Sequence, residues 1–225
     1  EGEEHGFRNA QTTVVAPTGT IGLVMGADTT GIEPQFSMVQ FKTLAGGGSL
    51  RIINQGLPSA LSRLGYSESR AKEIEEYVVG TSRINPTIPM DRLSDAGISS
   101  ELVKIVESKL PKVFHLRNAF APDILGKDYC VENLNMSEED FYVDEKGETK
   151  CKDEWFDTLA SIGFSHDEIE AANKIIIGNG TIEGAPGLKE KHLPIFDCAT
   201  PGSGKRSISP EGHVKMMAAA QPFIS

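Results

Sequence analysis

The clearest pattern of apolar and polar positions in this chain occurs three times. In two copies a leucine, a glycine, an aromatic residue and a serine come in the same order, at Leu61–Ser67 and Leu159–Ser165. Apolar residues then follow at helical spacing as far as Gly80 and Gly178. Serine is a preferred N-cap, and an apolar stripe of this period buries one face of a helix. The pattern predicts a short helix, a glycine turn and a serine-capped amphipathic helix in each copy.

The third copy is weaker. It runs from Leu93 through Gly97 and Ser99 to Leu110, and Pro111 ends it. Acidic residues such as Glu68 surround the glycine turns of the first two copies, and they would repel a nucleic-acid backbone. We therefore interpret the repeated helices as an insertion that packs on the main domain through its apolar stripe.

The two ends of the chain have other patterns. Apolar runs at 12–15 and 23–25 flank residues 16–22, which predicts a strand, a tight loop and the start of a helix. Alternation at 38–44 predicts a strand, Gly46–Gly48 a turn, and 50–53 a second strand. Near the other end, the pattern after Gly212 predicts a helix in which Ser225 is still an internal position.

Charge adds two expectations. Residues 137–157 hold nine acidic residues against three lysines, which predicts a solvated loop or hairpin with a surface turn at Asp144–Gly147. The whole chain has 22 Lys and Arg against 32 Asp and Glu, a net charge of -10, which argues against a nucleic-acid partner. No apolar run approaches the roughly 18 residues of a membrane span, and the acidic start is unlike a secretory leader. We expect a soluble cytoplasmic chain without a membrane partner.

The cysteines and histidines give little sign of a site. Cys130, Cys151 and Cys198 lack C-x-x-C spacing, which is typical of a reducing compartment rather than of a disulfide framework or a zinc ribbon. The histidines have no metal-binding spacing, so we predict no metal site. Cys198 adjoins a turn, and we favour a structural thiol over a redox role there.

The residues that point to chemistry form the loop Pro17, Thr18, Gly19, Thr20 and Ile21. Proline fixes one backbone dihedral angle, and glycine lets the main chain approach a ligand. The two threonines offer hydroxyls beside the amides of a helix start, where an anion binds well. The turn that follows at 29–34 carries Glu33. Together these residues predict a nucleotide phosphate site.

The run from Arg8 through this loop to Gly48 resembles the large subunit of ribonucleotide reductase. Other segments look like the adenosylcobalamin-dependent, or class II, branch of that family: Ile52–Gln55, Thr181–Pro186, His192–Ala199 and Gly212–Ser225. The resemblance covers essentially the whole chain and is loosest at residues 110–157.

The resemblance implies an α/β fold that is part of a ten-stranded α/β barrel. Residues 1–56 would be a barrel segment with the substrate-phosphate loop, 57–190 a mainly helical insertion, and 191–225 a return to the barrel. The loop Pro17–Ile21 would hold the diphosphate of a ribonucleoside diphosphate. The resemblance assigns no catalytic role to Glu33. It also implies adenosylcobalamin as cofactor, with no contacts placed on this chain, and a thioredoxin-like reductant.

One family motif is missing. The family forms its thiyl radical on the cysteine of an Asn-Pro-Cys-Gly-Glu motif, whereas the cysteines here follow Tyr129, Lys150 and Asp197. We therefore expect no catalytic residue in this chain, which would act with the remainder of the reductase or a complementary subunit. The alternative is a noncatalytic split-gene or regulatory fragment that binds nucleotide phosphate and assembles with a cysteine-bearing partner. A third hypothesis is an unrelated nucleotide- or phosphate-binding α/β enzyme with a convergent loop.

Overall fold

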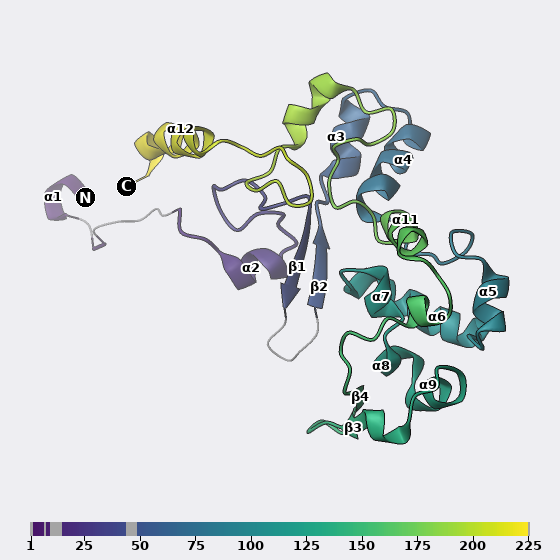
Figure 1. The fold of residues 1–225 in the computed structure, drawn as a ribbon. Helices are drawn as coiled ribbons and strands as arrows, with labels where there is room; N and C mark the ends of the chain where they lie inside the picture. The colour runs from purple at the N-terminus through teal and green to yellow at the C-terminus, as the bar shows by residue number, and fades with distance from the viewer. Residues whose placement is uncertain (1, 7, 10–14, 44–48, 225) are drawn as a thin grey trace.

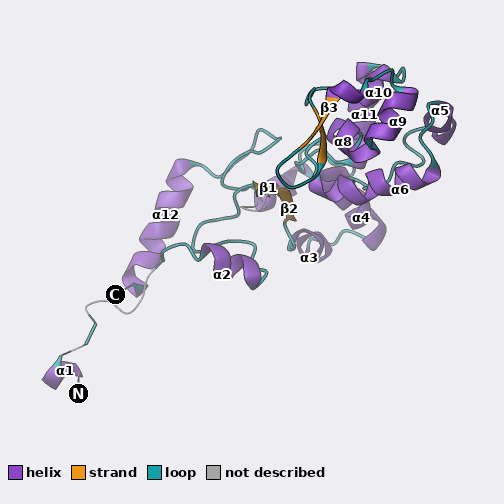
Figure 2. Ribbon diagram, turned by 90° about the horizontal axis from the view of Figure 1, so that it is seen from below, coloured by secondary structure: helices purple, strands orange, loops and turns teal. Residues whose placement is uncertain are grey.

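The computed structural model describes residues 2–6, 8–9, 15–43 and 49–224. A hairpin of β1 (Val39–Thr43) and β2 (Ser49–Ile53) lies in the middle of the molecule (Figure 1). Helices α1 (Gly2–His5) and α12 (Pro210–Ala220) lie on one side of this hairpin, and α3 to α11 on the other. Figure 2 shows the same separation from below.

The other elements are short. The remaining helices are α2 Gly19–Val24, α3 Leu57–Arg63, α4 Glu68–Val79, α5 Met90–Asp95, α6 Ser100–Lys109, α7 Leu116–Ala119, α8 Pro122–Leu125, α9 Lys127–Asn133, α10 Thr158–Ser161 and α11 His166–Ile176. The 3-10 turns are η1 Leu110–Lys112, η2 Glu138–Asp140, η3 Glu190–Phe196 and η4 Gln221–Phe223. A second hairpin joins β3 Phe141–Val143 to β4 Thr149–Cys151.

Both hairpins are antiparallel. Strands β1 and β2 confirm the strands predicted at 38–44 and 50–53. Residues 12–14 of the first predicted strand, and the turn predicted at Gly46–Gly48, lie outside the described residues. The described part of the chain is thus a mixed α/β structure in which these two hairpins hold the strands. The ten-stranded barrel stays a prediction.

The structure confirms all three copies of the repeat. The glycine that follows the short helix has a positive φ each time, and the serine side chain accepts a hydrogen bond from the amide of the third residue of the next helix. The glycines Gly65, Gly97 and Gly163 have φ of 83°, 79° and 92°, and the caps are Ser67, Ser99 and Ser165. Glycine reaches this conformation at little cost, so local sequence alone specifies each turn.

Apolar side chains gather in two clusters. The first runs from Ile84 to Ile177 and includes buried residues of α5 to α11. The second brings Met38, the residue before β1, together with Leu57 to Val78 of α3 and α4 and with the later segment from Ile182 to Cys198. The first copy of the repeat therefore packs against the strand hairpin, whereas the other two copies build the first cluster. The domain boundaries at residues 57 and 190 stay a prediction.

The acidic segment is a hairpin, as predicted. Strands β3 and β4 pair antiparallel, and the turn between them closes with hydrogen bonds from the Gly147 amide to the Asp144 carbonyl, at 3.0 Å, and from the Asp144 amide to the Glu148 carbonyl, at 2.9 Å. Gly147 has a positive φ of 80°. The acidic residues on this hairpin remain mostly exposed, which leaves their charges hydrated.

The helix near residue 225 ends earlier than predicted. Helix α12 stops at Ala220, and the chain continues as a 3-10 turn to Phe223 and an extended Ile224. Pro222 explains the correction, because proline has no backbone N–H to donate to the carbonyl four residues before it. None of the helices in the described part of the chain has the length and apolar character needed to span a bilayer.

Candidate functional site

The loop Pro17–Ile21 forms the turn that leads into α2. Helix α2 begins at Gly19, and the Gly22 amide donates to the Thr18 carbonyl at 2.9 Å. The turn at Thr29–Gly31 packs beneath the loop: the Thr30 carbonyl accepts a hydrogen bond from the Thr18 amide at 2.6 Å and another from the Thr18 hydroxyl at 3.0 Å. The sequence prediction of a tight loop followed by a helix is confirmed.

These contacts decide which donors of the loop are available. Both donors of Thr18 are directed to the Thr30 carbonyl, so this threonine shapes the loop instead of offering its hydroxyl hydrogen to a ligand. The amides of Gly19, Thr20 and Ile21 are the first of the helix, where no carbonyl four residues earlier belongs to the helix. The Thr20 hydroxyl has no partner among the described residues. An anion at this helix start would meet up to four donors.

The loop is open to solvent. Pro17 to Ile21 are all exposed, and 66% of the Ile21 surface is accessible. A Cβ atom added to Gly19 would meet no atom within 4 Å, so the space next to this residue belongs to solvent or to a ligand. Glu33, on the following turn, is exposed as well.

A residue that the sequence did not single out connects the loop to the strand hairpin. The carboxylate of Asp28, which follows α2, accepts a hydrogen bond from the Gln55 amide at 3.1 Å. Gln55 is the second residue after β2, and the amide of Asn54, the first, donates to the Met38 carbonyl at 3.2 Å. This hydrogen bond links the chain that follows α2 to the chain that follows the hairpin. A single aspartate in a turn has no pattern that would have revealed this contact.

Two of the segments that carry the family resemblance meet in the second cluster. Arg206 forms a two-pronged ion pair with Asp197, from Nε at 2.9 Å to Oδ1 and from Nη2 at 2.8 Å to Oδ2. The carboxylate of Glu183 accepts hydrogen bonds from the backbone amides of Lys205, at 2.6 Å, and Arg206, at 2.7 Å. The guanidinium of Arg206 is thus paired with the Asp197 carboxylate, and the hydrogen bonds to Glu183 hold residues 205–206 against that side chain.

The three cysteines are buried and free. The Cys198 thiol donates to the Phe196 carbonyl at 3.6 Å, and burial raises the pKa of this thiol, with a smaller contribution from the nearby Asp197 carboxylate. Burial also raises the pKa of Cys130, to about 11. Reactive cysteines have a lowered pKa and some exposure. These properties support the interpretation of Cys198 as a structural thiol.

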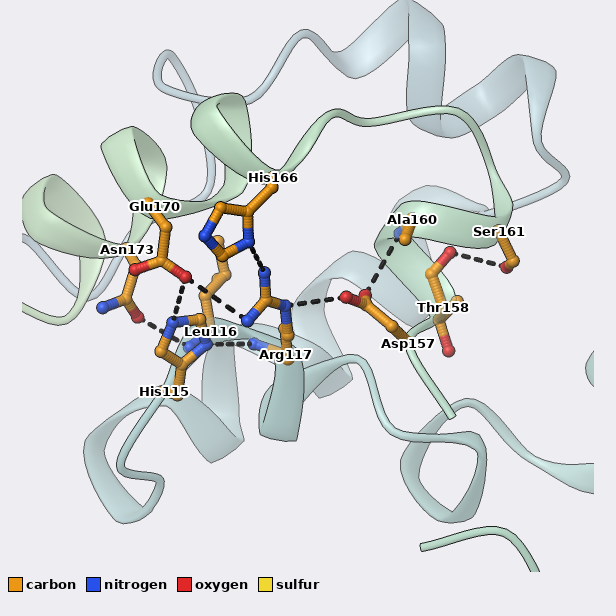
Figure 3. A network of polar contacts seen from close by, with 10 residues as sticks. All are labelled: His115, Leu116, Arg117, Asp157, Thr158, Ala160, Ser161, His166, Glu170 and Asn173. Atoms are coloured by element: carbon orange, nitrogen blue, oxygen red, sulfur yellow. Dashed lines mark hydrogen bonds and ion pairs between the residues drawn. The ribbon is translucent and has the colours of Figure 1, made fainter. Parts of the chain in front are cut away.

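A polar network joins α7 to α10 and α11 (Figure 3). At its centre Arg117 lies 2.7 Å from the Asp157 carboxylate, 3.3 Å from that of Glu170 and 2.8 Å from Nδ1 of His166, which accepts its hydrogen bond. Nε2 of His115 lies 3.2 Å from Glu170. Because these groups bond to one another across three helices, the network holds α7, α10 and α11 together. Among the described residues, no group of three His, Cys, Asp or Glu is arranged to hold a metal ion.

Comparison with known families decides the assignment. A sequence model described as the barrel domain of ribonucleotide reductase matches residues 1–94 and 139–225, which includes the loop, both strands of the central hairpin and α12. The chain belongs to this family. Residues 95–138, which the family model leaves unmatched, contain α6 to α9.

Three relatives share the whole length of this reductase segment. It is 50% identical over 228 residues to the vitamin B12-dependent ribonucleotide reductase of Bradyrhizobium diazoefficiens and 49% identical over 228 residues to that of Agrobacterium fabrum. In both cases the alignment covers 100% of this chain and 17% of the relative. The corresponding protein of Streptomyces avermitilis is 33% identical over 224 residues, which is 100% of this chain and 13% of the relative. The chain thus spans about a sixth of the length of the first two relatives.

Proposed function

We propose that this chain is the part of a vitamin B12-dependent ribonucleotide reductase that holds the diphosphate of the ribonucleoside diphosphate substrate. The observation that carries the proposal is the loop Pro17–Ile21, with the amides of Gly19, Thr20 and Ile21 at an exposed helix start. Backbone amides suit this task in an acidic chain, because they bind phosphate oxygens without a basic surface.

The loop would act by positioning. With the diphosphate held at the three amides and the Thr20 hydroxyl, the ribose lies at a fixed distance from the helix start, and fixed geometry is a large part of catalysis. Thr18 would keep the amides aligned through its two bonds to the Thr30 carbonyl. The reduction of the 2'-hydroxyl requires a radical cysteine and an electron-donating cysteine pair. We place those groups, and the contact with a thioredoxin-like reductant, in the remainder of the reductase.

The exposed surface supports a larger assembly. Helix α12 has no buried residue, and large apolar side chains are open to solvent in both α12 and α2, namely Val24 at 82%, Val214 at 66% and Met216 at 54%. Apolar surface of this kind marks an interface. We propose that the remainder of the reductase covers it and completes a ten-stranded α/β barrel.

Adenosylcobalamin is the cofactor that the relatives' names imply. Cavities of about 300–1,000 Å³ suit drug-sized ligands, and a corrin ring with its adenosyl group and nucleotide tail is much larger. A cavity between the hairpin and α11, lined by residues such as Phe41, Arg51 and Lys174, measures about 570 Å³ and is too small for it. This cavity cannot hold the cofactor by itself, and we assign the described residues next to it no contact with the cofactor.

The test is Gly19→Val in the full-length reductase that contains this segment. In the free protein the new side chain enters open space, so the fold should not change. In the complex it would occupy the place of the diphosphate, and loss of one to two charge-assisted hydrogen bonds should weaken binding roughly 10- to 100-fold. Gly19→Ala should have a smaller effect.

Equilibrium dialysis with a ribonucleoside diphosphate and with the matching nucleoside provides the control. The variant should lose affinity for the diphosphate and keep its affinity for the nucleoside, which has no phosphate to clash. Unchanged affinity for the diphosphate would contradict the proposal. Equal losses for both ligands would also contradict it, because they would indicate a general disturbance of the site.

A further inference from the structure

The first and last copies of the repeat meet through an internal two-fold relation. The chain leaving α4 bonds to the end of α11, with the amides of Thr81 and Ser82 donating to the carbonyls of Ile175 and Ile176, both at 2.9 Å. The chain leaving α11 does the same to α4: the amides of Asn179 and Gly180 donate to the carbonyls of Tyr77 and Val78, both at 2.9 Å. The two pairs of bonds correspond to each other in the repeat, in which Thr81 is equivalent to Asn179 and Tyr77 to Ile175, so each helix is capped by the chain that leaves the other.

Two glycines make this crossing possible. Gly80 and Gly178 are equivalent in the repeat and have φ of 74° and 93°. A Cβ atom on Gly80 would lie 2.3 Å from the Ile176 carbonyl oxygen, and one on Gly178 would lie 2.4 Å from the Gly80 nitrogen. Both distances are far below van der Waals contact. The two helix ends approach so closely that neither position accepts a side chain.

Arg51 lies at this crossing. Its Nη2 atom donates to the Val79 carbonyl at 2.6 Å and to the Ile177 carbonyl at 2.7 Å. These two carbonyls are again equivalent positions of the repeat. Both belong to helix C-termini, where the helix dipole favours a positive charge. One guanidinium from strand β2 therefore binds the two ends of the helix pair at once.

The same strand leads to the phosphate loop. Arg51 stands opposite Phe41 in the hairpin register, and its guanidinium carbon lies 5.9 Å from the centre of that ring. Four residues further along the chain, the Gln55 amide bonds to Asp28, which follows α2. A short path thus runs from the paired helix ends, through one strand, to the chain that follows α2, the helix into which the loop leads.

We propose that Arg51 is a positioning residue that fixes the paired helices α4 and α11 relative to the strand hairpin and thereby sets the position of the Pro17–Ile21 loop. The proposal rests on the proposed function only for its kinetic consequence. The structural consequence can be measured without it.

The test compares Arg51→Met and Arg51→Lys in the full-length reductase. Methionine preserves apolar bulk and removes both hydrogen bonds. The ammonium of lysine has three donors and can bind both carbonyls, although its shorter reach should make the rescue partial. Lys42→Met is the matched control, because this exposed lysine belongs to the same hairpin.

Hydrogen exchange gives the first readout. In Arg51→Met we expect exchange about tenfold faster or more at the Thr81, Ser82, Asn179 and Gly180 amides. Exchange should also become faster at the Gln55 and Thr18 amides, which report the hairpin and the loop. Arg51→Lys should lie between the wild type and Arg51→Met, and Lys42→Met should match the wild type. Should the Met variant fail to fold, the Lys variant alone still tests the proposal through its intermediate exchange.

Steady-state kinetics gives the second readout. A displaced loop both weakens diphosphate binding and misplaces the ribose, so in Arg51→Met the KM for the ribonucleoside diphosphate should rise and kcat should fall. The Gly19 test separates the two proposals. If it shows that diphosphate does not bind at this loop, and Arg51→Met then has faster exchange without a KM effect, the proposed function is refuted and the positioning role of Arg51 stays intact. Unchanged exchange at the crossing, or faster exchange there with none at Gln55 and Thr18, would overturn the role of Arg51.

Discussion

Substitution of Gly178 by alanine should disrupt the crossing of α4 and α11 far more than the same substitution at Gly163. Both glycines belong to the last copy of the repeat, and their φ angles of 93° and 92° are nearly equal. Their surroundings differ. A Cβ atom on Gly163 would meet no atom within 4 Å, whereas one on Gly178 would lie 2.4 to 2.6 Å from three backbone atoms of residues 78–80.

The pair separates two energetic terms. A left-handed conformation costs an alanine about 1–2 kcal/mol relative to glycine, and both variants bear that cost. Only Gly178→Ala adds a clash with backbone, and overpacking of this kind costs about 1–3 kcal/mol further. We therefore expect about 1–2 kcal/mol for Gly163→Ala and about 2–5 kcal/mol for Gly178→Ala.

Native-state hydrogen exchange measures this difference locally. The amides of Asn179 and Gly180 report the crossing, and the Phe164 amide, which donates to the Leu159 carbonyl at 3.0 Å, reports the other turn. Each variant is compared with the wild type at its own reporter amides. The acceleration at Asn179 and Gly180 in Gly178→Ala should exceed the acceleration at Phe164 in Gly163→Ala by roughly 5- to 150-fold, which corresponds to about 1–3 kcal/mol. Equal acceleration in the two variants would refute the reasoning, because it would mean that the crossing relaxes to admit a methyl group.

Three further predictions concern the caps and the thiols. Ser165→Ala removes the N-cap of α11 and should lower the stability of its first turn by about 1 kcal/mol, measurable as faster exchange of the Glu168 amide, whose bond to the serine hydroxyl is lost. The pKa of Glu168 is lowered from 4.5 to about 2, chiefly by the hydrogen bond from the Ser165 amide and next by that from Arg92. The folded state thus gains stability from the ionised carboxylate above pH 4.5 and loses it as the pH falls toward 2. In the wild type, the protection of the Ser165 amide against exchange should fall over that pH range. In Glu168→Gln, which has no carboxylate to protonate, it should not. Because burial raises the pKa of Cys198, iodoacetamide at pH 8 should label its peptide at least about tenfold more slowly in the native reductase than in urea, and equal rates would contradict a buried thiol.

The candidate loop shows how far local sequence reaches. The order of proline, threonine and glycine before an apolar run is enough to predict a turn into a helix, which begins at Gly19, because both depend on neighbouring residues. The sequence does not show which threonine hydroxyl of the loop is free for a ligand. The Thr18 hydroxyl is not, because the Thr30 carbonyl, on the following turn, accepts hydrogen bonds from both the amide and the hydroxyl of Thr18. The contact of Asp28 with Gln55 joins residues on separate elements, and no periodicity records such a pair.

The sequence by itself determined the repeated unit of this protein: the glycine turns at 65, 97 and 163 and the serine caps that follow are specified by backbone freedom and by side-chain bonds within one helical turn. It also indicated the two strands of the central hairpin, the first through its alternation and the second through its place after the glycine turn. Only the tertiary structure decided that the first and last copies cap each other and that Arg51 binds both helix ends. Bonds between residues so far apart in the chain form only once packing has brought the helix ends together.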